Sequence, residues 1–119
     1  MPGRNGARAP SPLKPADLHI LLALLERPRH GYEIMKEVER ESAGTVRLEV
    51  GTLYRLLARL LEAGWLAEAD EDGRRRNYRL TRLGRRTLRA EAERLALVVD
   101  RLRLRKLLRL RKLLPQGDI

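Results

Sequence analysis

The chain has 119 residues, the size of one domain, and carries 26 Lys and Arg against 16 Asp and Glu, a formal net charge of +10. It contains no cysteine, which excludes disulfide frameworks and cysteine-ligated zinc, and no apolar run approaches the roughly 20 residues needed to span a bilayer. Such a basic chain suggests a polyanionic partner, which is either a nucleic acid or an anionic surface.

The positive charge is concentrated at the two ends of the chain. Residues 1–15 hold three basic and no acidic side chains, and residues 101–119 hold seven basic side chains against one acidic. Residues 16–100 are nearly neutral, with 16 basic and 15 acidic side chains. Within that central part, eight arginines and no acidic residue lie between positions 73 and 90. This local cluster locates a polyanion site better than the net charge does.

The N-terminal part predicts a basic arm followed by a helix. Residues 1–15 are rich in Pro, Gly and Arg and predict a disordered arm. A signal peptide is rejected, because the apolar run that follows is short, contains His19 and lacks a small-residue cleavage site. Residues 16–27 predict a helix that Pro28 stops. Because this helix is apolar nearly all round, it needs two covers, its own domain and either the C-terminal helix or a second subunit.

Two amphipathic helices come next. The first covers residues 30–42 and stops at Gly44, and Tyr32 opens its apolar stripe and is predicted to be buried. The second runs from about residue 51 to 63, before Gly64. Its buried side is a row of leucines: Leu53, Leu56, Leu57, Leu60 and Leu61.

A hairpin follows these helices. Asp72-Gly73 is a hairpin turn signal, and residues 65–69 and 76–80 would be its two strands, with alternate side chains on opposite faces. The order helix–helix–helix–hairpin–helix predicts a mainly α fold with a small β-hairpin, a winged helix-turn-helix over residues 16–81.

A long helix is predicted after the hairpin, and we assign residues 82–102 to dimerisation. Its helix-forming composition continues to Leu114, before Pro115. Five apolar residues at spacings of four and three form an a/d seam: Leu88, Ala92, Leu95, Val99 and Leu102. This seam either packs on helix 16–27 of the same chain or pairs with a second subunit, in which case Leu18 and Leu22 join the interface.

The seam fails after residue 102. Residues 103–108 and 109–114 repeat the sextet RLRKLL, and a six-residue step spreads its leucines around a helix. We assign residues 103–119 to a basic tail. Its open interpretations are a frayed helix end, added DNA-backbone contact, an anionic surface and packing in a higher assembly, while poor facial separation argues against a membrane.

Three motifs carry a family resemblance: His30-Gly31-Tyr32, Gly51-Thr52-Leu53-Tyr54 and Tyr78-Arg79-Leu80-Thr81. In this order and spacing, residues 16–100 resemble the PadR family of transcriptional regulators. The resemblance implies a cytoplasmic, homodimeric winged-helix DNA binder, usually a repressor. It also implies a small hydrophobic effector as a further candidate partner. The chain departs from the family at Glu49-Val50, where a serine-proline pair is common and would cap the helix better.

The exposed side of predicted helix 51–63 is the candidate reader of DNA bases. It offers Thr52, Tyr54, Arg55 and Arg59, and arginine reads guanine through two hydrogen bonds. The alternative is an ordinary solvated face. For Tyr54, a separate interpretation stays open, in which the ring lies in the core and its hydroxyl meets a phosphate.

Two further places are candidates for phosphate contact. At the wing tip these are Arg74, Arg75 and Arg76, for which the alternative is a solvated turn balanced by the acidic residues 70–72. The other is His30, at a helix N-terminus that favours anions, for which the alternative is a helix cap.

No catalytic, metal or cofactor site is predicted, and we expect no enzyme and no membrane partner. Ser11 and Ser42 are the only serines, and no Gly-rich phosphate loop or paired-carboxylate spacing occurs. Two other functions stay open. One is a non-specific nucleic-acid or anionic-surface binder that acts through its basic termini, and the other is a pure dimerisation module.

Overall fold

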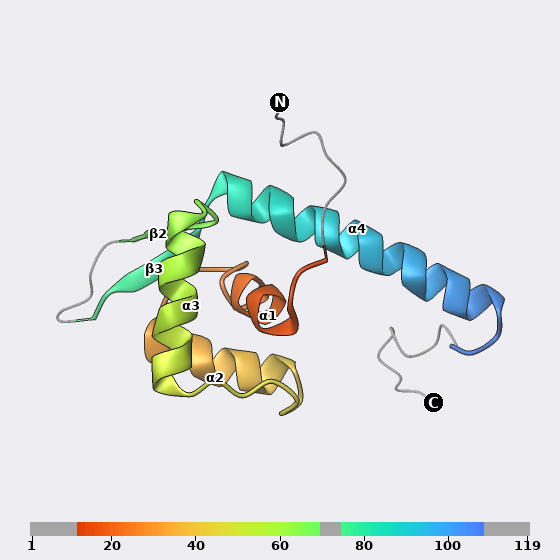
Figure 1. Cartoon of the computed structure of the whole chain (residues 1–119), viewed down its shortest axis with the longest axis horizontal. Coiled ribbons are helices and arrows are strands. Elements are labelled where there is room, and N and C mark those ends of the chain that lie inside the picture. The colour runs from red at the N-terminus through yellow and green to blue at the C-terminus, as the bar shows by residue number, and fades with distance from the viewer. Residues whose placement is uncertain (1–11, 70–74, 109–119) are drawn as a thin grey trace.

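The computed structural model describes residues 12–69 and 75–108. These residues form four helices and a three-stranded antiparallel sheet that lies at one side of the molecule (Figure 1). The elements in chain order are α1 (Pro15–Ala23), β1 (Arg29–His30), α2 (Gly31–Glu41), α3 (Val50–Glu62), β2 (Leu66–Glu68), β3 (Asn77–Leu80) and α4 (Arg82–Leu104). The predicted winged-helix order is confirmed. The predicted arm up to residue 11, the Asp72-Gly73 turn and the tail from residue 109 lie outside the described residues.

Helix α1 lies at the centre, between α2 and α4 (Figure 1). Ile20 and Leu21 are fully buried, and α4 of the same chain supplies the second cover that this all-apolar helix needs. The helix ends at Ala23, four residues earlier than predicted. The Arg29 Nε group donates a hydrogen bond of 2.6 Å to the Ala23 carbonyl oxygen, which caps the C-terminus from a later segment.

Helix α2 begins and ends within one residue of its predicted bounds. At its C-terminus the Gly44 N–H donates to the Glu39 carbonyl at 2.8 Å and the Ala43 N–H to that of Arg40 at 3.1 Å, a Schellman motif. Ala43 and Gly44 take φ angles of 54° and 82° for this turn. The predicted burial of Tyr32 is wrong, because the helix buries the Gly31, Ile34 and Val38 stripe, and the neighbouring Tyr32 is 60% exposed.

The predicted hairpin is part of a three-stranded sheet. Strand β3 pairs with β2, with Leu66 opposite Leu80, and on its other edge with the two-residue strand β1, with Arg29 opposite Tyr78. Tyr78 and Leu80 are buried and Arg79 is exposed, which follows the expected alternation. A strand of two residues carries no periodicity, so the sequence did not reveal β1.

Helix α4 starts against the sheet and extends past the other elements (Figure 1). The Thr81 side chain accepts a hydrogen bond from the Gly84 N–H at 2.9 Å and donates to the Gly64 carbonyl at 2.7 Å. The predicted continuation of the helix to Leu114 is wrong, because it ends at Leu104. Lys106 then has a φ of 65°, and the described leucines that follow the seam, Leu104, Leu107 and Leu108, are exposed.

Two buried carboxylates are paired with arginines, one between helices and one within α4. Asp17 on α1 pairs with Arg59 on α3 at 2.8 Å. Glu91 on α4 is 1% exposed and accepts two hydrogen bonds from Arg94, at 2.9 and 2.7 Å. The Arg94 hydrogen bonds lower the pKa of Glu91 against the effect of burial, and the Leu13 backbone N–H also lowers it.

No helix in the described part of the chain is long and apolar enough to cross a membrane.

Candidate nucleic-acid interface

The three sequence motifs meet at one polar hollow of about 440 Å³. The first motif lies at the N-terminus of α2, the second on the first turns of α3, and the third on β3. The residues lining this polar hollow are His30, Gly31, Tyr32, Tyr54, Arg75, Arg76 and Tyr78. Two guanidinium groups and three phenol rings therefore face one concavity, which suits a ligand with negative charge and hydrogen-bond acceptors.

Gly31 and Tyr54 explain why the first two motifs occur together. Gly31 is buried, and a Cβ atom placed there would overlap the Tyr54 hydroxyl and lie 2.8 Å from Cζ of the same ring. A side chain at position 31 would therefore displace the tyrosine. The absence of a side chain at Gly31 lets the Tyr54 ring rest on the first turn of α2 with 47% of its surface exposed.

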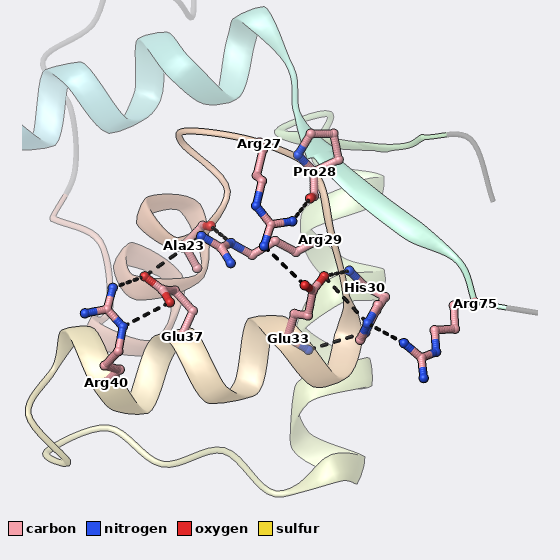
Figure 2. A network of polar contacts seen from close by, with 9 residues as sticks. All are labelled: Ala23, Arg27, Pro28, Arg29, His30, Glu33, Glu37, Arg40 and Arg75. Atoms are coloured by element: carbon pink, nitrogen blue, oxygen red, sulfur yellow. Dashed lines mark hydrogen bonds and ion pairs between the residues drawn. The ribbon is translucent and has the colours of Figure 1, made fainter. Parts of the chain in front are cut away.

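His30 is the N-cap of α2. Its Nδ1 atom accepts from the Glu33 N–H at 3.4 Å, and its own N–H donates to Glu33 Oε1 at 3.2 Å, a reciprocal capping box. Arg75 Nη1 lies 2.9 Å from the other ring nitrogen, Nε2 (Figure 2). The cap, one of the two interpretations left open for His30, is present, and the same ring also contacts the wing.

Glu33 is held by groups from two segments. Arg27, in the turn after α1, donates a hydrogen bond to Glu33 Oε2 at 3.2 Å (Figure 2). Burial raises the pKa of Glu33, but the His30 backbone N–H and the Arg27 side chain together lower it by more, so its carboxylate stays ionised. A fixed negative charge thus lies beside the imidazole of His30.

The predicted base-reading residues of α3 differ in their surroundings. Arg55 is exposed, and in the part of the chain that the structure describes no hydrogen bond or ion pair engages its guanidinium. Thr52 is half-buried on the first turn. Arg59 is half-exposed, but its guanidinium is bound to the buried Asp17. Of the two arginines, Arg55 is the one that an incoming ligand meets unpaired.

The wing arginines are exposed at the edge of the polar hollow. Arg75 reaches His30, and Arg76 pairs with Glu68 of β2 at 3.4 Å, an exposed ion pair of little strength. Arg74 lies outside the described residues. The sequence did not single out Gly31, Tyr32 and Tyr78 as lining residues, although all three belong to the motifs themselves.

The predicted dimer seam is divided along α4. Leu88 is buried against the chain's own core, while Ala92 and Leu102 are exposed and Leu95 and Val99 are half-buried. Leu18 and Leu22 of α1 are also half-buried. Leu104, which follows the seam on the opposite side of the helix, is 81% exposed.

Residues 20–90 match the transcriptional regulator PadR-like family. The chain belongs to this family. A Streptomyces fradiae protein, the "uncharacterized 37.1 kDa protein in transposon TN4556", is 40% identical over 81 residues, which is 68% of this chain and 23% of that protein. The transcriptional regulator YqjI of Escherichia coli is 28% identical over 105 residues, 87% of this chain and 51% of YqjI. The chain therefore spans about a quarter to a half of the length of these two relatives.

Solved structures show the same fold. A transcriptional regulator from Clostridium thermocellum is 29% identical, with a TM-score of 0.60 over 73% of this chain and 88% of that one. PadR of Bacillus subtilis in complex with operator DNA is 20% identical, with a TM-score of 0.56 over 66% of this chain and 46% of that one. The second likeness concerns the fold, since its sequence identity is low.

Proposed function

We propose that this PadR-family chain is a homodimeric repressor that binds a pseudo-palindromic DNA operator. The observation that carries the proposal is the polar hollow, where all three motifs meet beside the exposed first turns of α3. The solved complex of a fold relative with operator DNA supports a duplex as the partner. A repressor acts by occupying its site, so the fold needs only to bind DNA.

In this proposal α3 enters the major groove. Arg55 is unpaired among the described residues and reads a guanine, while Thr52 contacts a base or a phosphate. Arg75 and Arg76, and with them Arg74 of the wing tip, contact phosphates, because arginine forks match phosphate oxygens. The Tyr54 hydroxyl and His30 contact the same backbone at the polar hollow, and Arg59 shares its guanidinium between Asp17 and the flanking phosphate.

The dimer is proposed to form along the distal part of the α4 seam. The proximal residue, Leu88, is already used inside the chain, whereas Leu95, Val99 and Leu102 continue past the core with incomplete burial. A second copy would cover them together with Leu18 and Leu22. A two-fold dimer would place two α3 helices about 34 Å apart on successive major grooves.

Selection of bound duplexes from a random pool tests the proposal. We expect an inverted repeat with half-sites about one helical turn apart. Recovery of no shared repeat at moderate salt would refute sequence-specific binding.

The alternative of non-specific binding through the termini has its own test. In one variant the basic residues of 1–15 and 103–119 are all replaced by glutamine. A specific regulator retains its selected site with a smaller salt slope, whereas the tail hypothesis predicts that binding disappears. The dimerisation-module hypothesis predicts that neither the variant nor the native chain selects a duplex.

A further inference from the structure

His30 faces two hydrogen-bond donors that it cannot satisfy together. The Glu33 backbone N–H points at Nδ1 from 3.4 Å, and Arg75 Nη1 lies 2.9 Å from Nε2. A neutral imidazole has one N–H group and one lone pair, so only one of its nitrogens accepts a hydrogen bond. The helix cap and the wing contact therefore compete for a single acceptor.

Each tautomer leaves one conflict. With the proton on Nδ1, Nε2 accepts from Arg75, but Nδ1–H then opposes the Glu33 N–H and the cap is lost. With the proton on Nε2, the cap is made and Nε2–H faces Glu33 Oε1 at 3.6 Å, but it also opposes the Arg75 guanidinium. Moving Arg75 away from the ring removes the conflict, because that donor then no longer faces Nε2.

The charges around the ring determine its response to a ligand. Glu33 lies on α2 and is paired with Arg27 from the turn after α1. Arg75 and Arg76 come from the wing, and the phenols of Tyr54 and Tyr78 come from α3 and β3. Apart from the Arg75 contact, the ring is mostly enclosed, with 13% of its side-chain surface exposed. In this arrangement Arg75 is the positive group in direct contact with the His30 ring.

We propose that the polar hollow binds one phosphodiester of the DNA backbone. The phosphate draws Arg75 away from His30, and DNA binding is therefore accompanied by uptake of one proton on the imidazole. The inference rests on the proposed DNA-binding function. A phosphate on Arg75 replaces the cation beside Nε2 by a negative group, with Glu33 on the other side. Both changes favour the imidazolium, and the cap bond that protonation sacrifices is long at 3.4 Å.

Proton uptake makes affinity depend on pH with a definite sign. The protonated ring is favoured more in the complex than in the free protein, so DNA affinity is highest at low pH and falls as pH rises. Since histidine titrates near pH 6.5 in water, we expect a three- to tenfold loss between about pH 6 and 8. One proton limits the slope to about tenfold per pH unit.

The chain is well suited to a direct test, because it contains only two histidines, His19 and His30. Fluorescence anisotropy would measure affinity for a short mixed-sequence duplex at low salt and constant ionic strength across this pH range. His30→Asn keeps a good N-cap residue but cannot titrate, so we expect its affinity to be independent of pH. His19→Asn is the matched control and retains the pH dependence of the native chain. An identical pH profile for native and H30N protein would overturn the inference.

Proton NMR of the two imidazole rings locates the proton. We expect the pH at which the His30 ring signal titrates to move upward when the duplex is added, while the His19 signal stays. Arg75→Ala reduces this movement, because the cation is already absent from the free protein. Arg79→Ala removes the same charge from the opposite face of β3 and leaves the movement unchanged.

Two outcomes separate the possible failures. A duplex that binds without moving the His30 signal refutes the phosphate seat and leaves the proposed DNA-binding function standing, whereas a chain that binds no duplex at any pH refutes that function. Inorganic phosphate alone forms the last arm. If it moves the His30 signal and the duplex does not, the hollow takes a free phosphate and its assignment to the DNA backbone is wrong.

Discussion

Replacing Gly31 by alanine is expected to lower the free energy of unfolding, although alanine is the better helix former. The added methyl group would overlap the Tyr54 hydroxyl and lie 2.8 Å from Cζ and 3.2 Å from Cε1 of that ring. Overpacking of this kind costs about 1–3 kcal/mol. Because 47% of the Tyr54 surface is exposed, the ring can shift outward, which puts the expected cost near the lower end, about 1–2 kcal/mol.

The cause can be isolated by removing the ring. In a Tyr54→Ala background the methyl group at position 31 meets no ring, so the same substitution becomes neutral or stabilises by up to about 1 kcal/mol. Gly51→Ala is the matched control, since a Cβ at Gly51 meets open space, and we expect it to stabilise the chain by about 0.5–1 kcal/mol.

Urea denaturation at one fixed protomer concentration measures all of these variants, because any association changes the apparent stability. An equal loss of stability on Gly31→Ala in the native and the Tyr54→Ala backgrounds would refute the steric explanation. So would a gain in the native background of the size seen for Gly51→Ala.

Four other predictions test separate parts of the molecule. Ala43→Gly is expected to stabilise the chain by about 0.5–1 kcal/mol in urea denaturation, because Ala43 adopts a left-handed φ of 54°, and a loss would contradict the Schellman argument. Because Arg94 lowers the pKa of Glu91 in the folded state, the stability that this carboxylate contributes is present above about pH 4.5 and is lost as pH falls through its folded pKa. Glu91→Gln is therefore expected to lower the free energy of unfolding by about 1–3 kcal/mol at neutral pH and to make the melting temperature less dependent on pH in the acid range. An unchanged dependence of the melting temperature on pH would contradict this. Arg55→Lys keeps the charge but loses the two-pronged hydrogen bonding, so discrimination at one base of the selected duplex is expected to fall by about 1–3 kcal/mol in competition binding while non-specific affinity is retained. Leu102→Glu is expected to shift sedimentation toward the monomer, whereas Leu104→Glu, on the opposite side of α4, leaves it unchanged; equal effects would rule out the proposed face.

Much of the fold was predictable because its signals are local. The leucine spacing placed α3 within one residue of its observed bounds, and alternation correctly assigned Tyr78 and Leu80 to the buried face of β3. The residues at the helix starts also agree with their local chemistry. The Thr81 side chain caps the N-terminus of α4, whereas Glu49 provides no side-chain cap to α3.

Errors occurred where the outcome depends on distant contacts. The end of α1 is determined by the Arg29 side chain, and the exposure of Tyr32 by the choice of stripe that α2 buries. Helix propensity in the first RLRKLL sextet, residues 103–108, did not extend α4 beyond Leu104, because the leucines there are exposed and bury no apolar stripe.

The candidate site was only partly predictable. The sequence identified its motifs and their order, but Arg75 and His30, which meet at the site, lie 45 residues apart. Because of that separation, the sequence does not reveal the contact between Arg75 and His30 or the competition of two donors for the His30 imidazole. It likewise hides the pairing of Arg59 with Asp17, which distinguishes it from Arg55.

Taken by itself, the sequence determined the order of the four helices and of the two hairpin strands, the core leucines and the family, because each depends on short-range periodicity or on motifs that are read along the chain. The tertiary structure decided which of the two α3 arginines is unpaired among the described residues. It also decided which two donors compete for the single acceptor of the His30 imidazole, and which part of the α4 seam is left uncovered. These properties arise from distances between segments that a linear sequence does not contain. The net charge of +10 indicated a polyanionic partner, but the site proposed to bind one, the polar hollow, lies in the nearly neutral central part of the chain.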